Sequence, residues 1–492
     1  MHLKELVGKL EMVASAGDLS VDIRGIAYDS RQVEPGFLFV AIKGFVTDGH
    51  FYINDAVTRG AAAVLLQDAT AAPPGVPWVQ VCDTRSGLAA VSARFYNYPA
   101  RVLHLAGVTG TNGKTTTTYL LHSIYRHGGH KVGLIGTISN YIGDKKLPVE
   151  RTTPEALDLQ RLLRQICDAG CRKAVMEVSS HALALNRVDV RDFNSVIFTN
   201  LTQDHLDFHK DMEDYFNAKA RLFKDMNPKG TAVINADDRY GQKLVRLGRG
   251  RVVTYGVRQT ADVKGYNLQV KAEGVVFDVA SQWGNFTLDL RLTGLFNVYN
   301  ALAAAAAGLS EGYSPDEIQE ALAGVTGVPG RFERVDCGQE FTVIIDYAHT
   351  PDGLDNVLLA AQGIARNKVI AVFGCGGDRD KTKRPLMGKI AANRADFIVV
   401  TSDNPRSENP MDIIADIVSG FDGPGAGKNY TVVPDRREAI RFAFHRAQPG
   451  DIIVIAGKGH EDYQIIGNTR LSFDDRKVAS EILKEMGYDK DR

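Results

Sequence analysis

Cysteine is scarce in this sequence, long apolar runs are missing, and the charges nearly cancel. The five cysteines among 492 residues are odd in number and scattered, which argues against a disulfide framework. Cys167 and Cys171 lie one helical turn apart, but the sequence offers no second pair of zinc ligands near them. We therefore expect buried free thiols in a reducing compartment for Cys82, Cys167, Cys171, Cys337 and Cys375.

No apolar stretch approaches the roughly 18 residues of a membrane span, and residues 1–9 carry charges where a signal peptide is apolar. The 58 Lys and Arg residues oppose 59 Asp and Glu residues, which gives a formal net charge of −1. This balance provides no overall attraction to nucleic acid or to an anionic membrane, although a local basic pocket could bind phosphates. We expect a cytoplasmic monomer that acts on small molecules, with no nucleic-acid partner and no membrane insertion.

The length predicts about three domains of roughly 150 residues each. Residues 1–98 are typical of a small mixed α/β domain, with buried strands expected at 36–42 and 61–66 and a helix at 55–59 between them. The boundary is expected at Tyr98-Pro99, because the residue before a proline favours extended geometry.

Residues 99–330 repeat the order strand, glycine loop, helix. Short, continuously apolar strands separated by helices predict a parallel sheet that is buried on both faces. We expect these strands at 105–108, 132–135, 174–178, 195–199 and 232–235. Alternating residues that begin at 274 and 286 then predict antiparallel strands, and the alanine-rich stretch 297–309 predicts a packed helix.

Residues 331–492 begin a second series after a break at Val328-Pro-Gly-Arg331. We expect four strands, each followed by a helix, at 341–345, 369–373, 397–401 and 452–456. The predicted fold class is therefore α/β in three domains: a small mixed N-terminal domain, a central P-loop ATPase-like parallel-sheet domain and a C-terminal doubly wound, Rossmann-like domain.

The segment Gly107-Val-Thr-Gly-Thr-Asn-Gly-Lys-Thr-Thr116 follows a strand and opens a helix, as a phosphate-binding loop does. Backbone N–H groups can face phosphate oxygens, Lys114 can reach the β- and γ-phosphates, and the Thr115 hydroxyl can bind Mg²⁺. The standard spacing requires glycine at 108, where this chain has Val108. The loop predicts ATP binding through Gly110, Thr111, Asn112, Gly113, Lys114, Thr115 and Thr116.

This variant of the loop resembles that of the Mur ligases, the ATP-dependent amide-bond-forming enzymes of peptidoglycan precursor synthesis. Folylpolyglutamate synthase carries a similar loop, so the loop alone does not decide the substrate. The likeness continues in order through Asp29-Ser-Arg31, Thr152-Thr-Pro154, Glu177-Val-Ser-Ser-His181, Thr199-Asn-Leu-Thr-Gln-Asp-His205, Asp346-Tyr-Ala-His349 and Asp403-Asn-Pro-Arg406. It implies a UDP-sugar-binding domain at 1–98, an ATP-binding domain at 99–330 and an amino-acid-binding domain at 331–492.

Glu177 and His205 are each expected where a strand ends, at the edge where doubly wound sheets bind ligands. Glu177 and Thr115 offer the oxygen atoms that Mg²⁺ prefers, whereas a lone histidine is more often structural, and the residues alone indicate a solvated Lys219. The resemblance implies instead that His205 binds a second metal and that Lys219 is N6-carboxylysine. A lysine with a lowered pKa can add CO₂ to form such a metal-binding carbamate. The expected catalytic residues are Glu177, His205, Lys219 and Lys114.

The resemblance also implies the nucleotide contacts. Those to the UDP-muramoyl-dipeptide are Ser30, Thr152, Thr153, Ser179 and Arg187, and further ATP contacts are Asn297, Asn300, Arg331 and Asp346. Hydroxyls and a guanidinium suit pyrophosphate and carboxylate groups. Asn297 is equally suited to cap the helix that begins near it.

The tetrad Asp403-Asn-Pro-Arg406 follows an expected strand and, from the residues alone, indicates a polar turn. In the Mur ligases this tetrad marks enzymes that add diaminopimelate, and lysine-adding relatives lack the arginine. Diaminopimelate has one more carboxylate than lysine, and a guanidinium can bind that group bidentately. The implied contacts to it are Arg379, Asp403, Asn404, Pro405, Arg406, Gly457 and Glu461.

The resemblance thus implies a ligase that uses ATP and Mg²⁺ to join meso-2,6-diaminopimelate to UDP-N-acetylmuramoyl-L-alanyl-D-glutamate through an acyl phosphate. Three alternatives are a folylpolyglutamate-synthase-type ligase, a lysine-adding Mur ligase and a nucleotide-binding protein without enzyme activity. Asp29-Ser-Arg31 and the tetrad at 403–406 favour the diaminopimelate-adding ligase over these alternatives.

Overall fold

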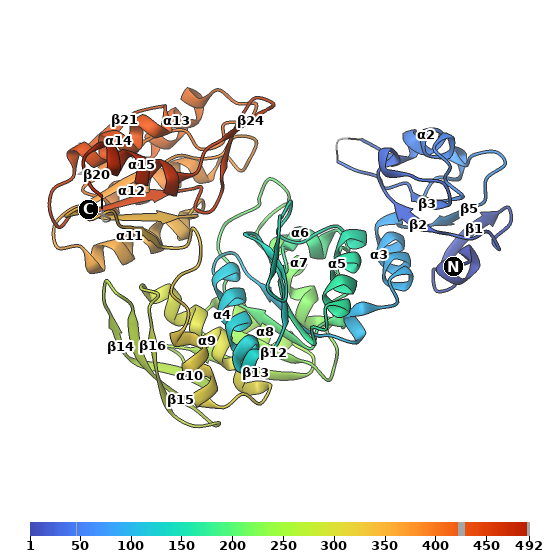
Figure 1. Ribbon diagram of the computed structural model, residues 1–492, viewed down its shortest axis with the longest axis horizontal. Helices are drawn as coiled ribbons and strands as arrows, with labels where there is room; N and C mark the ends of the chain where they lie inside the picture. Colours follow the sequence, from blue (N-terminus) through green and yellow to red (C-terminus); the bar gives the residue numbers. More distant parts are fainter. Residues whose placement is uncertain (46, 422–428, 490–492) are drawn as a thin grey trace.

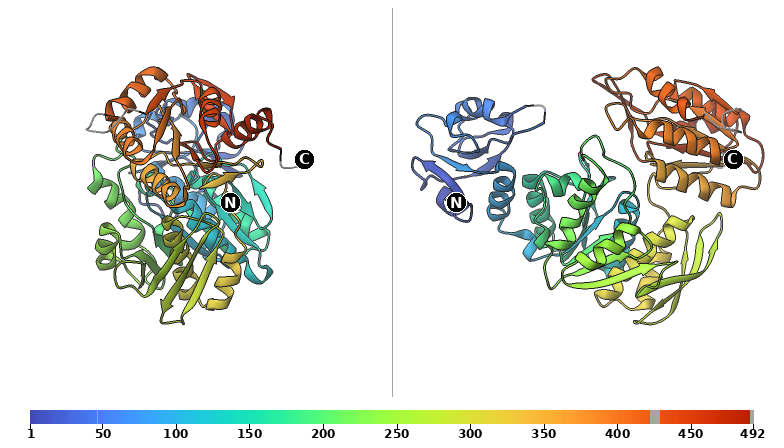
Figure 2. Two further views of the ribbon diagram at one scale, coloured as in Figure 1. Left: turned by 90° about the vertical axis from the view of Figure 1, so that its left-hand side faces the viewer. Right: turned by 180° about the vertical axis from the view of Figure 1, so that it is seen from behind.

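The computed structural model describes residues 1–45, 47–421 and 429–489. The chain forms three lobes, and the central lobe lies between the other two (Figure 1), as the view from behind also shows (Figure 2, right). The described strands form one main sheet in each lobe, of five, eleven and six strands, and a separate two-stranded hairpin. Within these ranges we find no helix with the length and apolarity that crossing a bilayer requires.

The N-terminal sheet has the strand order β1-β5-β4-β3-β2. The two predicted strands and the predicted helix are confirmed as β3, β4 and α2, whereas β1 was missed because both its faces are largely exposed and β2 because it is very short. The elements are α1 Leu3–Val7, β1 Met12–Ala16, β2 Gly25–Ala27, β3 Phe37–Val40, α2 Ile53–Thr58, β4 Ala63–Leu66, β5 Trp78–Val81 and α3 Thr84–Phe95.

The central sheet has the order β16-β15-β14-β13-β12-β11-β6-β10-β7-β8-β9. Its middle is parallel, and all five predicted strands are confirmed there as β6, β7, β10, β11 and β12. The predicted antiparallel pair is confirmed as β15 and β16 at one edge. The strands are β6 His104–Thr109, β7 Val132–Ile135, β8 Asn140–Ile142, β9 Lys145–Leu147, β10 Lys173–Glu177, β11 Ser195–Phe198, β12 Thr231–Asn235, β13 Arg251–Gly256, β14 Val263–Val270, β15 Val275–Ser281 and β16 Phe286–Leu290.

Helices cover both faces of the central sheet, which is why its strands are apolar on both sides. One face packs against α4, α9 and α10, and the other against α5, α6, α7 and α8. The alanine-rich stretch is confirmed as the packed helix α9. These helices are α4 Lys114–Arg126, α5 Ala156–Asp168, α6 Ser180–Ala184, α7 Met212–Lys224, α8 Arg239–Leu247, α9 Leu295–Ser310 and α10 Pro315–Ala323.

The C-terminal sheet has the order β17-β18-β22-β19-β20-β21, with β17 antiparallel to an otherwise parallel set. Helices α11, α12 and α13 cover one face, and α14 and α15 cover the other, so the doubly wound prediction is confirmed. The elements are β17 Glu333–Val335, β18 Thr342–Asp346, α11 Pro351–Ile364, β19 Val369–Phe373, α12 Lys383–Arg394, β20 Phe397–Val400, α13 Pro410–Val418, β21 Tyr430–Val432, α14 Arg436–Arg446, β22 Ile452–Ala456, β23 Tyr463–Ile466, β24 Thr469–Ser472 and α15 Asp475–Glu485.

Two sequence expectations are wrong in detail. The fourth strand, β22, is followed first by a glycine-rich loop and the β23–β24 hairpin rather than directly by a helix, because Gly457 and Gly459 take positive φ angles that turn the chain away from the sheet. The five cysteines are free as predicted, but Cys82 is exposed rather than buried, since it lies just beyond the end of β5.

A fully buried ion pair joins the first residues of α14 and α15. The Arg436 guanidinium donates to both carboxylate oxygens of Asp475, at 2.8 and 2.7 Å. It also donates to the carbonyl oxygens of Ser402 and Ala456, just beyond β20 and at the end of β22. One side chain therefore ties both helices to the carboxyl edge of the sheet.

Arg436→Ala should lower the free energy of unfolding by about 3–5 kcal/mol, because it leaves the Asp475 carboxylate buried without a partner. Urea denaturation followed by circular dichroism measures the loss. Arg437→Ala is the matched control: Arg437 pairs with partly exposed acids on α15, and its loss should cost less than about 1 kcal/mol. Equal losses in the two variants would contradict the structural role of the buried pair.

Candidate functional site

The phosphate-binding loop lies between β6 and α4 and packs closely on the end of β11. Gly110 has φ 152°, and a Cβ there would collide with the Thr199 hydroxyl. Gly113, the residue before α4, has φ 84°, and a Cβ there would collide with the amide oxygen of Asn300. These two positions require glycine, because both the backbone angle and the space exclude a side chain. The loop therefore has a fixed shape before any ligand binds.

Two lysine amines lie at the centre of the loop. The amine of Lys114 donates to the carbonyl oxygens of Gly110, at 3.0 Å, and Thr111, at 2.7 Å. The amine of Lys219, from α7, donates to the same Gly110 oxygen at 3.0 Å. Neither amine has a carboxylate within 4 Å among the described residues. The pair leaves positive charge that anionic groups would neutralise.

Lys219 is fully buried, so the alternative of a solvated lysine is wrong. Its amine lies 4.7 Å from the centre of the Tyr215 ring. Burial lowers the pKa of Lys219 well below its usual value, and the charge of Lys114 lowers it further. Burial also lowers the pKa of Lys114, although Glu177 and Asp204 oppose that shift. A lowered pKa favours the uncharged amine, which is the form that reacts with an electrophile such as CO₂.

Glu177 ends β10 beside this loop. Its carboxylate accepts hydrogen bonds from the Thr115 hydroxyl at 3.1 Å, the Thr137 backbone N–H at 2.8 Å and the Thr137 hydroxyl at 3.0 Å. The Thr115 hydroxyl in turn accepts a bond from Arg331 at 2.9 Å. The structure thus brings Glu177 and Thr115 together, two oxygen donors that suit a hard dication.

His205 lies at the same edge with a positive φ of 56°. Its Nε2 is 3.3 Å from Asp204, and its ring packs edge-on against His181 at 4.8 Å between ring centres. Burial lowers the pKa of His205 to about 3, so the ring is a neutral nitrogen donor. Among the described residues no three His, Cys, Asp or Glu side chains form a metal cluster on their own. A dication here would therefore need oxygen atoms from phosphate groups or from a modified lysine.

Asn297 and Asn300 lie near the start of α9, as expected. Gly294, not Asn297, precedes the first turn, so the N-cap alternative for Asn297 is wrong. The Asn297 amide donates to the Thr293 carbonyl at 2.8 Å and accepts from Asn300 at 3.0 Å. Asn300 thereby lies directly beneath Gly113 of the loop.

Arg331 and Asp346 come from the start of the C-terminal lobe. Arg331 reaches the loop through Thr115, and its guanidinium stacks over the Tyr347 ring at 4.5 Å. The Asp346 carboxylate is buried and accepts from the backbone N–H groups of Phe332 and Ala348, at 2.7 and 2.8 Å. Asp346 therefore orders the segment that carries Arg331.

Four of the five expected nucleotide-sugar contacts cluster beside Glu177. Thr152 accepts from the Thr137 hydroxyl at 3.1 Å, and Thr153 donates to the Glu177 carbonyl at 2.8 Å. Ser179 donates its backbone N–H to Thr153 and caps α6, and Arg187 pairs with Glu155 at 2.7 Å. The fifth, Ser30, is not part of this cluster: it is buried in a turn of the N-terminal lobe at Ser30–Gln32.

A cavity of about 1040 Å³ opens between the central and C-terminal lobes. The central lobe contributes Thr137, Thr152 and His205 to its lining. From the expected amino-acid contacts the C-terminal lobe contributes Arg379, Asp403, Asn404, Arg406, Gly457 and Glu461. Pro405 is buried behind the lining, where its carbonyl accepts the Glu408 N–H at 3.1 Å. The two sheets therefore turn their carboxyl edges toward one shared space.

The lining of this cavity carries charges of both signs. Arg406 donates to the Gly377 carbonyl at 2.7 Å and Arg379 to the Asp378 carbonyl at 3.1 Å, and in the described part of the chain neither has a carboxylate within 4 Å. Asp403 and Glu461 line the same cavity, and burial, with the charge of Asp403, raises the pKa of Glu461. The cavity thus presents both unpaired cations and buried acids to a ligand.

Three models of one family match the chain along most of its length. They are the Mur ligase family, catalytic domain, at residues 22–96, the Mur ligase middle domain at 108–308, and the Mur ligase, glutamate ligase domain, at 330–459. The chain belongs to the Mur ligase family. The expected resemblance is therefore confirmed, and so is the three-domain α/β architecture of this Mur ligase.

Relatives named UDP-N-acetylmuramoyl-L-alanyl-D-glutamate–2,6-diaminopimelate ligase match almost end to end. The protein from Caldanaerobacter subterraneus is 49% identical over 95% of this chain and 96% of its own, and that from Syntrophomonas wolfei is 46% identical over 98% and 99%. A solved structure of the same name is 34% identical with a TM-score of 0.68 and covers 99% of both chains. Folylpolyglutamate synthase from Mycobacterium tuberculosis, at 18% identity and a TM-score of 0.62 over 76% of this chain and 93% of its own, shares the fold.

Sequence reasoning did not single out several residues of this Mur ligase site. Asp204 is 3.3 Å from His205, 3.8 Å from His349 and 3.9 Å from Lys383; burial opposes its charge, but these three neighbours hold the pKa of Asp204 below its usual range. Lys458 could have been found from the sequence, because it belongs to the polar residues that directly follow β22. The residues missed are Thr137, Asp204, Lys383 and Lys458.

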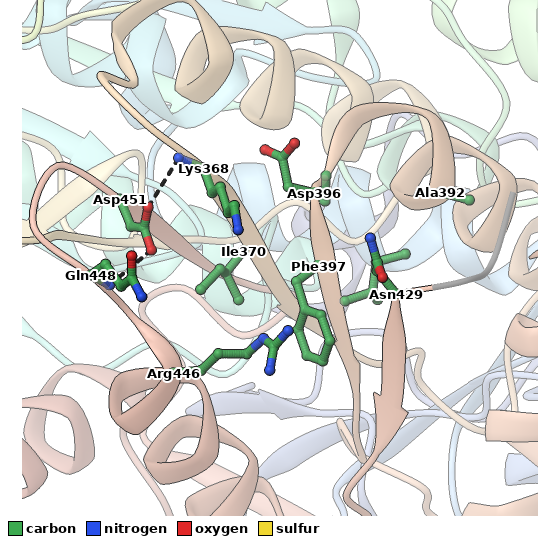
Figure 3. A pocket seen from close by; sticks show the side chains of 11 residues that line it. Lys368, Ile370, Ala392, Asp396, Phe397, Asn429, Arg446, Gln448 and Asp451 are labelled. Carbon is green, nitrogen blue, oxygen red and sulfur yellow. Dashed lines mark hydrogen bonds between the residues drawn. The ribbon is translucent and has the colours of Figure 1, made fainter. Parts of the chain in front are cut away.

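A second cavity, of about 540 Å³, lies at the opposite, amino edge of the C-terminal sheet (Figure 3). Its acids are engaged with the backbone: Asp451 accepts the Lys368 N–H at 3.0 Å, and Asp396 accepts the Val369 N–H at 2.8 Å. In this family fold the carboxyl edge is where ligands bind, so this cavity is not the candidate site.

Proposed function

We propose that this Mur ligase adds meso-2,6-diaminopimelate to UDP-N-acetylmuramoyl-L-alanyl-D-glutamate in peptidoglycan precursor synthesis, with ATP as the energy source. The observation that carries the proposal is the shared cavity, which His205 and Thr137 of the central lobe line together with Arg379 and Arg406 of the C-terminal lobe. Relatives named for this reaction match nearly the full chain at 46–49% identity, which supports the same substrate.

The proposed ATP site is the loop from Gly110 to Thr116. Its support is the pair of lysine amines that lack carboxylate partners among the described residues, because a polyphosphate would supply the missing negative charge. Lys114 would contact the transferred phosphoryl group, and Arg331 would contact the same group from the C-terminal lobe. Asn297, Asn300 and Asp346 would act at the adenine and ribose side.

Four groups in this edge fit Mg²⁺ by donor type: the Thr115 hydroxyl, the Glu177 carboxylate, the neutral His205 ring and a carbamate on Lys219. Bound there, Mg²⁺ would neutralise phosphate charge and polarise the phosphoryl group. The carbamate itself rests on the buried, uncharged amine, which can attack CO₂ and release a proton. Carboxylation would also place a negative charge beside the Lys114 amine, which shares the Gly110 carbonyl.

The remaining residues would hold the two other substrates. Residues 1–98 would bind the uridine end through Ser30, and Thr152, Thr153, Ser179 and Arg187 in domain 99–330 would bind the muramoyl-dipeptide and its phosphates. Domain 331–492 would bind diaminopimelate, with Arg379 and Arg406 on its distal carboxylate, Asp403 and Glu461 on its distal ammonium, and Asn404 as a neighbouring contact. Pro405 and Gly457 would fix the shapes of the two loops, after β20 and after β22, that carry most of these contacts.

The reaction then follows from position. The D-glutamyl carboxylate would attack the γ-phosphorus of ATP, and ADP would leave as an acyl phosphate forms. The free amine of diaminopimelate would attack the acyl carbon, and the C–O bond to phosphate would break as the amine loses its proton. Lys114 and the arginines would stabilise the charge that develops, and no protein nucleophile is needed.

Two other ligase functions are less supported. A lysine-adding enzyme would leave Arg406 and Arg379 facing a substrate with no second carboxylate. A folylpolyglutamate-synthase-type ligase shares the fold at 18% identity, but the relatives at 46–49% carry the diaminopimelate name.

Lys114→Ala should lower turnover by about 100-fold or more, because the transferred phosphoryl group loses its cation. Phosphate release with all three substrates measures turnover, and thermal melting checks the fold. Lys131→Ala, at an exposed lysine beyond α4, should leave turnover unchanged. Near-normal turnover of Lys114→Ala would remove this loop from the mechanism.

Lys219→Ala should be almost inactive, and added acetate or formate should restore part of the activity by replacing the carbamate oxygens. The same phosphate-release assay follows the rescue, with exposed Lys210→Ala as the control that needs none. An unmodified amine in fresh, active enzyme, seen by mass measurement at neutral pH, would refute the carbamate. Acidic conditions are unsuitable because they decarboxylate it.

The wild type should prefer meso-diaminopimelate to L-lysine by about two to four decades in kcat/KM, because lysine leaves the Arg406 charge without a partner. Arg406→Ala should raise KM for diaminopimelate and narrow the preference, and Arg406→Lys should restore it only in part, since an ammonium lacks the planar fork. Arg470→Ala, at an exposed arginine that lines the same cavity, is the control. Equal use of both amino acids by the wild type would overturn the proposed function.

A further inference from the structure

Lys458 is a buried lysine without an assigned role that contacts two residues lining the amino-acid part of the cavity, Asn404 and Glu461. It follows β22 in the Gly457–Glu461 loop, and its side chain is 0% exposed. Its amine donates to the Asn404 amide oxygen at 3.2 Å and to the Glu461 carboxylate at 3.1 Å, and the Tyr463 ring centre lies 5.4 Å away. A desolvated ammonium is costly unless it is paired, so its position calls for a reason.

The first consequence concerns the orientation of Asn404. Its amide oxygen accepts from Lys458 and from the Ile465 backbone N–H at 2.9 Å, and its amide nitrogen donates to Glu461 at 2.8 Å. Both partners of the oxygen can only donate, and the carboxylate can only accept while it is ionised. Lys458 thus helps to fix which face of the amide is turned to each neighbour.

The second consequence concerns charge. Asp403 and Glu461 are two acids that line the cavity and act on each other, and the Lys458 ammonium pairs with Glu461. The nearby Arg436 is already neutralised by Asp475. Two acids are therefore set against one positive charge that no other acid shares, which leaves room for a single further cation. Without Lys458, two acids would face each other and Glu461 would tend to take up a proton.

We propose that Lys458 is a positioning residue for the amino-acid substrate: its buried ammonium keeps Glu461 charged and keeps Asn404 oriented to donate to Glu461, so that the Glu461 carboxylate is placed to accept from the distal ammonium of the substrate. This inference rests on the proposed function, since it takes diaminopimelate as the amino acid. It predicts that Lys458 matters only for substrates that carry an ammonium at the distal end.

The test compares meso-diaminopimelate with L-2-aminopimelate, which keeps both carboxylates and the reacting amine but has no distal ammonium. In Lys458→Met, KM for diaminopimelate should rise by about 10- to 100-fold, the range expected for loss of hydrogen bonds to a charged group. Aminopimelate has no distal ammonium, so it loses no such hydrogen bonds. Its KM, or its inhibition constant against diaminopimelate if it is not a substrate, should change by less than about threefold. KM for ATP should stay as in the wild type.

Lys458→Gln keeps a donor for Asn404 without the charge and should fall between Lys458→Met and the wild type, which also covers the case in which the methionine variant fails to fold. Lys477→Met, at an exposed lysine lining the same cavity, should match the wild type. Equal loss with both amino acids, or no loss with diaminopimelate, would overturn the role of Lys458. A wild type without activity on diaminopimelate would instead refute the proposed function, so the two failures are distinct.

Discussion

Two buried lysine amines that share one backbone carbonyl form the constraint on which the carboxyl edge of the central sheet depends. Lys114 and Lys219 each lie 3.0 Å from the Gly110 oxygen. Two like charges held together away from water are costly, so the arrangement favours a lost proton or a bound anion. Three features shape this site: the glycines of the loop, the burial of α7 and the oxygen donors at the end of β10. Bound anionic ligands would neutralise its positive charge.

The same principle extends across the cavity to the C-terminal lobe. Arg379 and Arg406 lack carboxylate partners in the described chain, while Asp403 and Glu461 outnumber the one lysine between them. A zwitterionic group with one carboxylate and one ammonium matches this division of charge. Specificity in such a site comes from what a wrong ligand leaves unpaired as much as from what the right one binds.

The sequence was informative where a local pattern decides the structure. Continuous apolar runs identified the parallel strands, and the sequence at 107–116 predicted a glycine loop between a strand and a helix, because neither depends on distant partners. The exposed strand β1 and the hairpin after β22 could not be found in this way, since pairing across the sheet and two positive φ angles decide them. Likewise, the sequence could not single out Thr137 and Asp204. Their place in the site depends on contacts with side chains that the fold brings next to them, Glu177 for Thr137 and His349 and Lys383 for Asp204.

The contacts between the central and C-terminal lobes have a thermodynamic consequence. Asn112 and Thr115 of the phosphate loop bond directly to Asp352, at 2.6 Å, and Arg331, at 2.9 Å, of the other lobe. The proposed nucleotide loop is thus also a docking surface, and the two roles would share atoms. Linkage then requires reciprocity: if docking of the C-terminal lobe raises affinity for the nucleotide, the nucleotide raises the stability of docking by the same factor. Nucleotide occupancy and the assembly of the amino-acid site would then be coupled equilibria.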